Sequence, residues 1–357
     1  MNRSIYIATT DSFSGKSLIG LGVMQMIMRK TTNIGYFRPV IDDYTDGVKD
    51  NHIETMLSHF KLNMNYDEAY AFTRSQVIAY KNSNRLNDVY DVIIQKYKAL
   101  EERFDFVLIE GTDFFNEGSS FEFDLNSSIA QSLNVPVILV VRGKAESEND
   151  LVEHVQIELD TFRSKDIKVL ATILNVCEFD TKSITQKIQE KVGEGTLISA
   201  IPTSDILGKP TIKEIAQKLK AHVLYGADNL GIIPKKNIVG AMMLPNFLGH
   251  VTEDCLAIMP GDRSDLLVGI LQAHLSNNYP RIGGIILTGG IVPDPNIVKL
   301  LDGSQTIVPI LVVKEGTFKI TSDVDKIKPK IYPDSTEKIK ISIDMFEEQV
   351  DVKHLDE

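Results

Sequence analysis

The residues best suited to chemistry lie near the start of the chain, where Gly15-Lys16-Ser17 follows a short run of β-type residues. A Walker A loop has the pattern G-x-x-x-x-G-K-[ST]: backbone N–H groups surround phosphates, the lysine reaches the outer ones and the hydroxyl ligates Mg²⁺. The end of this pattern is intact, but Thr10 stands where the first glycine belongs. Only glycine takes positive φ there without strain. Three interpretations stay open: a loop that binds nucleotide, a relic, or a site for another anion.

Polar residues at the ends of apolar runs supply further candidates. Glu110 ends one run, as the acid of a Walker B strand does, and would hold Mg²⁺ together with Ser17, or would be a helix-capping or surface acid. Arg38 would pair with a phosphate or carboxylate, or form a plain surface salt bridge. Asn175 would contact a base edge or form a turn. The nucleotide-binding candidates are Thr10, Asp11, Ser14, Gly15, Lys16, Ser17, Arg38 and Asn175, the metal candidates are Ser17 and Glu110, and no catalytic residue is assigned.

Runs rich in β-branched residues alternate with helical patterns, at residues 4–9, 33–40, 104–111, 136–143 and 168–176. Several runs are apolar at consecutive positions, which is typical of strands buried on both faces. The alternation predicts an α/β fold of the P-loop NTPase type, with a parallel sheet flanked by helices. Residues 15–29 form a helix that is apolar on nearly every side and is expected inside the molecule. A helix over 211–222 is expected to close this first unit.

A second αβ series begins near residue 238 and predicts a smaller α/β domain. Gly261-Asp262-Arg263 and Thr288-Gly289-Gly290 each follow a strand-like run, where glycines permit close backbone approach or simply form turns. We therefore expect a P-loop domain over residues 1–225, a second domain over 235–335 and a linker over 336–357.

Composition limits the class of partner. The 357 residues carry a net charge of −11, which argues against nucleic acid as the main partner because phosphate backbones require a basic surface. We find no run of 18 apolar residues and no signal peptide, so we expect a soluble cytoplasmic protein that does not contact membranes. Cys177 and Cys255 are far apart, and we expect two buried thiols in a reducing compartment. The seven histidines show no metal-ligand spacing.

The first 222 residues resemble the dethiobiotin synthetase group of P-loop proteins. The matching stretches are 9–17, 35–40, 107–111, 135–141, and Ile201-Pro202 ahead of Pro210-Thr211. The second domain resembles the DRTGG domain, through residues 260–263 and 286–290. The two domains in this order resemble the N-terminal half of the long form of phosphate acetyltransferase.

This resemblance implies a function that the residues alone do not show. Long phosphate acetyltransferases interconvert acetyl-CoA plus phosphate with acetyl phosphate plus CoA in a C-terminal domain. The resemblance implies such a domain on the same chain, a homo-oligomer, a small-molecule metabolite effector and a non-catalytic regulatory role for these residues. The alternatives are an ATP-dependent ligase or amidase of the dethiobiotin or cobyrinate type, and a purely structural scaffold. Where the loop binds nucleotide, Mg²⁺ with ATP is the expected cofactor.

The chain also departs from the dethiobiotin synthetase pattern. Thr9 replaces a glycine, and the glycines that follow the family's acid are replaced here by Thr112-Asp113-Phe114. Arg38 replaces the family's lysine. Lys16, Ser17 and Glu110 carry over by position. Asp113 and Asp11 are the next candidate acids for a metal, and Asp50 is a candidate for the family's second metal-binding Asp.

Overall fold

The computed structural model describes residues 3–9, 14–43, 49–112, 119–303 and 308–351 of the chain. It divides into two compact units, unit 1 (residues 1–203 and 331–357) and unit 2 (residues 204–330). Three residues singled out in the sequence, Thr10, Asp11 and Asp113, lie outside the described residues.

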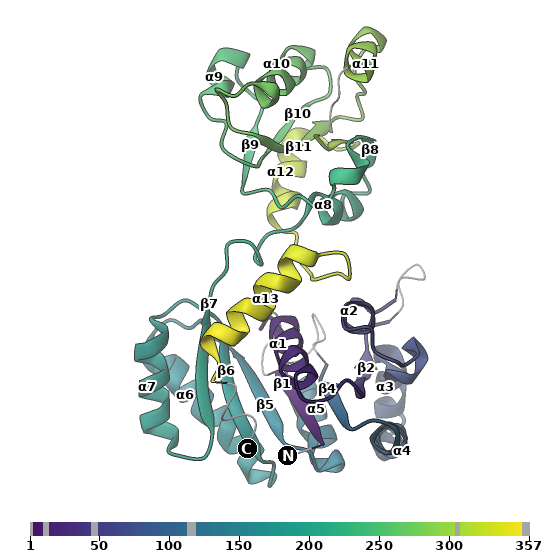
Figure 1. The fold of residues 1–357 in the computed structure, drawn as a ribbon, viewed down its shortest axis with the longest axis vertical. Coiled ribbons are helices and arrows are strands. Elements are labelled where there is room, and N and C mark those ends of the chain that lie inside the picture. Colours follow the sequence, from purple (N-terminus) through teal and green to yellow (C-terminus); the bar gives the residue numbers. More distant parts are fainter. Residues whose placement is uncertain (1–2, 10–13, 44–48, 113–118, 304–307, 352–357) are drawn as a thin grey trace. The chain divides into compact units, whose positions relative to one another are not determined.

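Unit 1 is built on a seven-stranded sheet in which every strand pairing is parallel (Figure 1). Its strands are β1 (Ser4–Thr9), β2 (Ile34–Ile41), β3 (Tyr70–Thr73), β4 (Phe106–Glu110), β5 (Val137–Arg142), β6 (Val169–Cys177) and β7 (Leu197–Pro202). Their order is β3-β2-β4-β1-β5-β6-β7, which places β1 between β4 and β5. The five predicted strands and the predicted fold class are confirmed.

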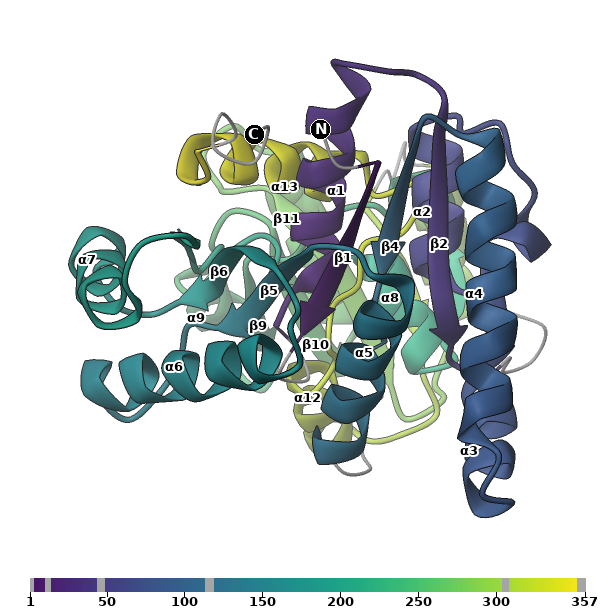
Figure 2. The same ribbon diagram turned by 90° about the horizontal axis from the view of Figure 1, so that it is seen from below.

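Helices cover both faces of this sheet (Figure 2). They are α1 (Lys16–Met28), α2 (Asn51–His59), α3 (Arg74–Asn82), α4 (Leu86–Arg103), α5 (Ser119–Leu133), α6 (Glu148–Ser164), α7 (Thr181–Val192) and α13 (Thr336–Gln349). Apolar side chains of α4, α5, α6 and α7 form one buried cluster with alternate residues of the strands, such as Tyr6 and Ala8. The strands are buried along almost their whole length because both faces are covered.

Helix α13 packs directly on α1, although three hundred residues separate them in sequence (Figure 1). A Cβ at Gly22 would lie 2.1 Å from Cγ of Phe346, so the two helices meet where α1 has no side chain. We expected residues 336–357 to form a linker, but residues 336–349 form a helix that belongs to unit 1. Its residues Ile339, Ser342 and Phe346 are buried at helical spacing, and burial of the apolar Ile339 and Phe346 explains the packing.

Unit 2 contains a smaller, mixed sheet with the strand order β8-β12-β11-β10-β9. Its elements are α8 (Ile212–Lys218), β8 (His222–Tyr225), β9 (Lys236–Val239), α9 (Leu244–Leu248), β10 (Cys255–Pro260), α10 (Ser264–Leu275), β11 (Ile282–Thr288), α11 (Pro295–Asp302), β12 (Ile310–Val312) and α12 (Thr317–Asp325). Strands β9 to β12 are parallel and β8 is antiparallel to β12. Helices α9 and α10 cover one face, and α8 and α12 the other.

The expected boundary between the domains differs from the observed one. We expected the helix over 211–222 to close the first unit, but α8 packs in the core of unit 2. Its buried residues Ile212 and Ile215 lie against Leu256, Ile286 and their neighbours. An amphipathic pattern shows that a helix has a buried face, but does not show which core covers that face.

Within the described residues, no helix is long and apolar enough to cross a membrane. Cys177 and Cys255 are both free and buried, as the sequence predicted.

The contact between α1 and α13 gives a first prediction. Gly22→Ala is expected to lower the free energy of unfolding by about 1–3 kcal/mol, because the new methyl group overlaps the Phe346 ring and forces the helices apart. In an open helix the same change would stabilise by roughly 0.5–1 kcal/mol. Urea unfolding measures the difference. The control is Gly249→Ala, where the nearest atom lies 3.5 Å from the new Cβ, and a stabilising effect at Gly22 would contradict the packing.

Candidate functional site

The loop after β1 ends at Gly15, which has a left-handed backbone and caps the N-terminus of α1. Two features disfavour a side chain at Gly15: its φ is +69°, and a Cβ would lie 2.4 Å from Nδ2 of Asn175. Lys16 is the first residue of α1 and is only 2 % exposed. The helix therefore begins with its free N–H groups and a lysine at the C-terminal edge of the sheet.

Neighbouring strands bring three polar side chains to this edge. Strands β2 and β4 pair in register, with Tyr36 opposite Leu108 and Phe37 opposite Ile109. One residue further along, Arg38 and Glu110 therefore lie next to each other at the end of β4. Tyr36 and Arg38 are two residues apart and so lie on the same face of β2.

Glu110 is fully buried and is the centre of a cluster of polar groups, which we call the Glu110 cluster: Lys16, Tyr36, Arg38, His52 and Glu110. Oε1 of Glu110 lies 2.7 Å from Nδ1 of His52, 3.3 Å from NH1 of Arg38 and 3.7 Å from Nζ of Lys16. Oε2 accepts a hydrogen bond of 2.7 Å from the hydroxyl of Tyr36. Nζ of Lys16 also donates to the carbonyl oxygen of Gly111 at 2.5 Å.

The electrostatics of this cluster keep Glu110 ionised. Burial alone would raise the pKa of Glu110, but His52, Lys16 and Arg38 together hold that pKa well below its ordinary value. Burial and the charge of Glu110 raise the pKa of Tyr36 well above its ordinary value. Tyr36 therefore stays protonated and acts as a hydrogen-bond donor to the carboxylate.

Helix α2 positions His52 and starts at an acidic cap. The carboxylate of Asp50 accepts hydrogen bonds from the backbone N–H groups of His52 and Ile53, and Oδ2 lies 3.7 Å from Nε of Arg38. Nδ1 of His52 lies 3.3 Å from Oγ of Ser17. Since a carboxylate only accepts hydrogen bonds, the short contact with Glu110 places a proton on Nδ1. Asp50 is therefore engaged with a helix end and a guanidinium group.

Two buried asparagines brace the turns around the cluster. Nδ2 of Asn175, on β6, donates to the carbonyl oxygens of Ser14 and Gly15 at 2.8 and 3.0 Å. Asn126, on α5, accepts from the backbone N–H of Thr112 at 2.9 Å and donates to its carbonyl oxygen at 3.0 Å. The observed contacts of Asn175 are thus with the loop backbone.

The structure brings together all seven of the predicted site residues that it describes. Ser14, Gly15, Lys16, Ser17, Arg38, Glu110 and Asn175 all lie around the start of α1. The sequence interpretation missed Tyr36, His52 and Asn126. The two-residue spacing of Tyr36 and Arg38 was a usable signal, whereas nothing local marked His52 or Asn126. Among the described residues, no group of three or more His, Cys, Asp and Glu side chains is arranged to hold a metal.

Unit 2 carries a separate polar feature at the ends of its strands. Arg263 donates from Nε and NH2 to the two carboxylate oxygens of Asp265, both at 2.8 Å, and from NH2 to the carbonyl oxygen of Met242 at 3.0 Å. The hydrogen bonds from Arg263 lower the pKa of Asp265 to about 2. Gly289 and Gly290 have positive φ. These groups order the loops after β9, β10 and β11.

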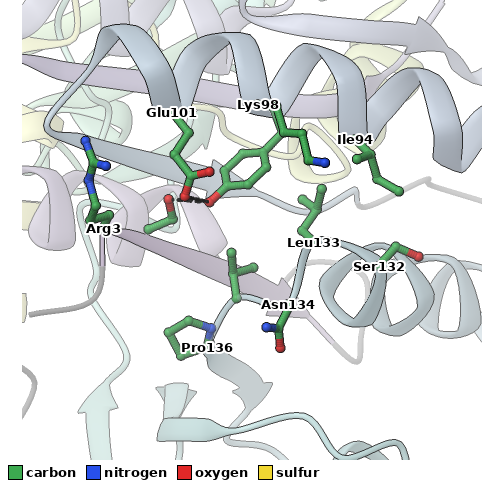
Figure 3. A pocket seen from close by; sticks show the side chains of 11 residues that line it. Arg3, Ile94, Lys98, Glu101, Ser132, Leu133, Asn134 and Pro136 are labelled. Carbon is green, nitrogen blue, oxygen red and sulfur yellow. Dashed lines mark hydrogen bonds between the residues drawn. The ribbon is translucent and has the colours of Figure 1, made fainter.

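A cavity of about 280 Å³ lies in unit 1 at the opposite edge of the sheet, where β1 and β5 begin (Figure 3). The hydroxyl of Tyr97 there lies 2.8 Å from Oγ of Ser4 and 3.0 Å from Oε1 of Glu101. Burial raises the pKa of Tyr97 to about 12. None of the sequence-predicted site residues lines this cavity.

Comparison with protein families identifies both units. A model of the AAA domain matches residues 3–211, which is more than half of the chain. The chain belongs to the AAA-domain family. A DRTGG domain follows at residues 214–327, and the predicted order of the two domains is confirmed. The boundary between the two matches agrees with the position of α8 in unit 2.

The relatives are phosphate acetyltransferases. The AAA-plus-DRTGG chain is 36% identical to the phosphate acetyltransferase of Nitratidesulfovibrio vulgaris and 34% identical to that of Synechocystis, over 99% of this chain in each case. It spans 51% of the length of each of these proteins, and the resemblance to their N-terminal half is confirmed. Among solved structures, the CBS and DRTGG domains of a Clostridium perfringens pyrophosphatase match with 17% identity and a TM-score of 0.28, covering 53% of this chain and 82% of that chain.

The Glu110 cluster gives a second prediction. Glu110→Gln is expected to lower the free energy of unfolding by about 3–5 kcal/mol, because the change leaves the buried cations of Lys16 and Arg38 without their shared carboxylate. Urea unfolding at neutral pH measures the loss. The matched control is Glu178→Gln, which removes an exposed ion pair with Lys144 and is expected to cost less than about 1 kcal/mol. Equal costs for the two variants would contradict the central role of Glu110.

Proposed function

We propose that these residues form a regulatory and assembly region of a phosphate acetyltransferase, and that the loop site senses a nucleotide or another anionic metabolite. The match with phosphate acetyltransferases over 99% of the chain supports the choice of enzyme. One structural observation carries the non-catalytic role: the loop lysine and the acid of β4 are bound into the same buried cluster. In this arrangement Lys16 and Glu110 form an ion pair with each other. In addition, Thr9 stands where dethiobiotin synthetases have a glycine, so a side chain takes the place of the bare backbone that those ATP-dependent ligases have there.

The positively charged side chains at the site support an anionic ligand. Lys16 and Arg38 lie within 4 Å of Glu110, beside the N-terminus of a helix whose dipole favours negative charge. A phosphate group that reached this site would compete with Glu110 for the same donors. Binding would therefore rearrange the Glu110 cluster, and such a rearrangement is what a sensor requires.

The third prediction tests sensing. ATP, GTP and acetyl-CoA are titrated calorimetrically into the protein and added in thermal-unfolding measurements. A ligand at ~100 times its Kd should stabilise the protein by ~2.7 kcal/mol. Lys16→Met, which keeps the volume of the buried stem, is expected to abolish binding, and Lys144→Met, at an exposed lysine, is expected to leave it unchanged. Circular dichroism checks that both variants fold.

The same experiment separates this proposal from its alternatives. Absence of heat and of any thermal shift would contradict the sensing role. A separate assay that detects ADP release with a carboxylic acid substrate would support an ATP-dependent ligase.

In a phosphate acetyltransferase that contains these residues, their deletion is expected to abolish the metabolite response while acetyl phosphate formation continues. An unchanged response after deletion would contradict the regulatory proposal.

The assembly role is supported by unit 2. Large apolar side chains are exposed beyond the ends of its parallel strands, on the loops after β9 and β11 and in the first turn of α12, all at one edge of the sheet: Met242, Met243, Ile291, Val292 and Phe318. Phe318 is 90 % exposed and Met243 73 %. Exposed apolar surface of this kind is typical of protein–protein contacts, and we propose a second copy of the chain as the partner.

The fourth prediction concerns this assembly. Light scattering coupled to gel filtration is expected to give a mass above that of a monomer. Phe318→Ser is expected to shift the population toward the monomer, because it removes an aromatic side chain that the proposed interface would bury. The control is Leu275→Ser, because Leu275 is also exposed but ends α10, at the opposite edge of the sheet. A monomeric wild-type protein, or equal effects of the two variants, would contradict assembly through this edge.

A further inference from the structure

His52 lies between the two side chains that the sequence assigns to Mg²⁺. Its Nδ1 atom is 2.7 Å from Oε1 of Glu110 and 3.3 Å from Oγ of Ser17. An Mg²⁺ ion bound by both oxygens would need to lie 2.0–2.1 Å from each. The imidazole ring, held by the capped helix α2, takes that space.

Protein donors also surround the carboxylate of Glu110. Tyr36 occupies Oε2, while His52, Arg38 and Lys16 surround Oε1. A carboxylate has about four lone-pair sites; Tyr36, His52 and Arg38 take three of them, and the Lys16 cation lies beside Oε1 at 3.7 Å. In addition, Gly20 of α1 passes so close that a Cβ there would lie 3.1 Å from Oε2. The residues present therefore do not fit a magnesium ion between Ser17 and Glu110.

We infer that the loop site binds its phosphate-bearing ligand without a divalent metal, with the Nδ1–H group of His52 and the guanidinium group of Arg38 in place of the ion. The inference rests on the proposed sensing function and names its ligand class as a nucleotide polyphosphate free of metal. His52 and Arg38 supply N–H donors where a P-loop enzyme would use a cation. Lys16 keeps its usual place at the start of α1.

The contacts of Arg38 also orient its guanidinium group. Arg38 contacts Glu110 through NH1 and faces Asp50 through Nε, so its guanidinium group is held in one orientation from two sides. Guanidinium groups match phosphate oxygens in a bidentate geometry. A polyphosphate without metal carries more negative charge than its magnesium complex, so it competes with the carboxylate of Glu110 for Lys16 and Arg38.

The first test probes metal binding directly, without nucleotide. Mn²⁺ replaces Mg²⁺ as a paramagnetic probe, and electron paramagnetic resonance measures the bound fraction. Wild-type protein is expected to leave Mn²⁺ free. His52→Asp is expected to bind Mn²⁺, because it removes the ring and adds an oxygen ligand beside Ser17 and Glu110. The matched control is His59→Asp, at an exposed position on the same helix, and it is expected to leave Mn²⁺ free. Mn²⁺ bound by wild-type protein and lost in Glu110→Gln would overturn the inference.

The second test measures ATP affinity with excess Mg²⁺ and with excess EDTA. Wild-type protein is expected to bind ATP at least as tightly in EDTA as in Mg²⁺, and His59→Asp is expected to behave in the same way. His52→Asp is expected to bind at least about tenfold more weakly in EDTA than in Mg²⁺. His52→Asn, which keeps an N–H donor near Glu110 and adds no carboxylate, is expected to retain binding in EDTA.

The outcomes separate the two proposals. Wild-type binding that needs Mg²⁺ and is lost in Lys16→Met would overturn the metal-free inference and leave the sensing function in place. Binding in neither buffer would overturn both. Where His52→Asp fails to fold, as judged by circular dichroism, the comparison of wild-type protein and His52→Asn in the two buffers decides.

Discussion

The buried carboxylate of Glu110 is the constraint on which the loop site depends. An ionised group without exposure to water is tolerated only when several donors face it, and Lys16, Tyr36, Arg38 and His52 do so from α1, β2 and α2. Strand β2, helix α1 and helix α2 position these donors. The pairing of β2 with β4 places Arg38 and Tyr36, and the neighbouring strand β1 leads into α1. A change at any of these donors therefore leaves a charge that the others must compensate.

Much of this site could be predicted from the sequence because its signals are local. An apolar run that ends in Glu110, and Gly15-Lys16-Ser17 ahead of an apolar helix, each identify a strand or helix end without knowledge of the fold. The short edge strand β3 was not predicted, because its four residues are mostly half-buried and carry little pattern. Asn175 was expected to contact a base edge or to form a turn, and its contacts with the carbonyl oxygens of Ser14 and Gly15 depend on the order of the strands.

Two other outcomes depended on long-range packing. The face of α8 and the face of α13 both have helical periodicity, yet one packs in unit 2 and the other in unit 1. Sequence position had suggested that α8 closes the first unit and that α13 lies in a linker. His52 carried no spacing signal, since its partners Ser17 and Glu110 are 35 and 58 residues away along the chain. The sequence therefore predicted only part of the chemistry of the site, because His52 contacts the side-chain oxygens of both Ser17 and Glu110.

The path of the backbone connects the DRTGG domain to the loop site through covalent links. The chain leaves unit 1 after Thr203 and re-enters it at Ile331. The carbonyl oxygen of Ile331 accepts hydrogen bonds from Asn51 at 2.8 Å and Thr55 at 3.3 Å, both on α2, the helix that carries His52. The following helix, α13, then packs on α1, which carries Lys16. A ligand that displaced Lys16 or His52 would act on the two helices that hold this returning segment. Such a shift becomes a signal only where the segment has two stable positions.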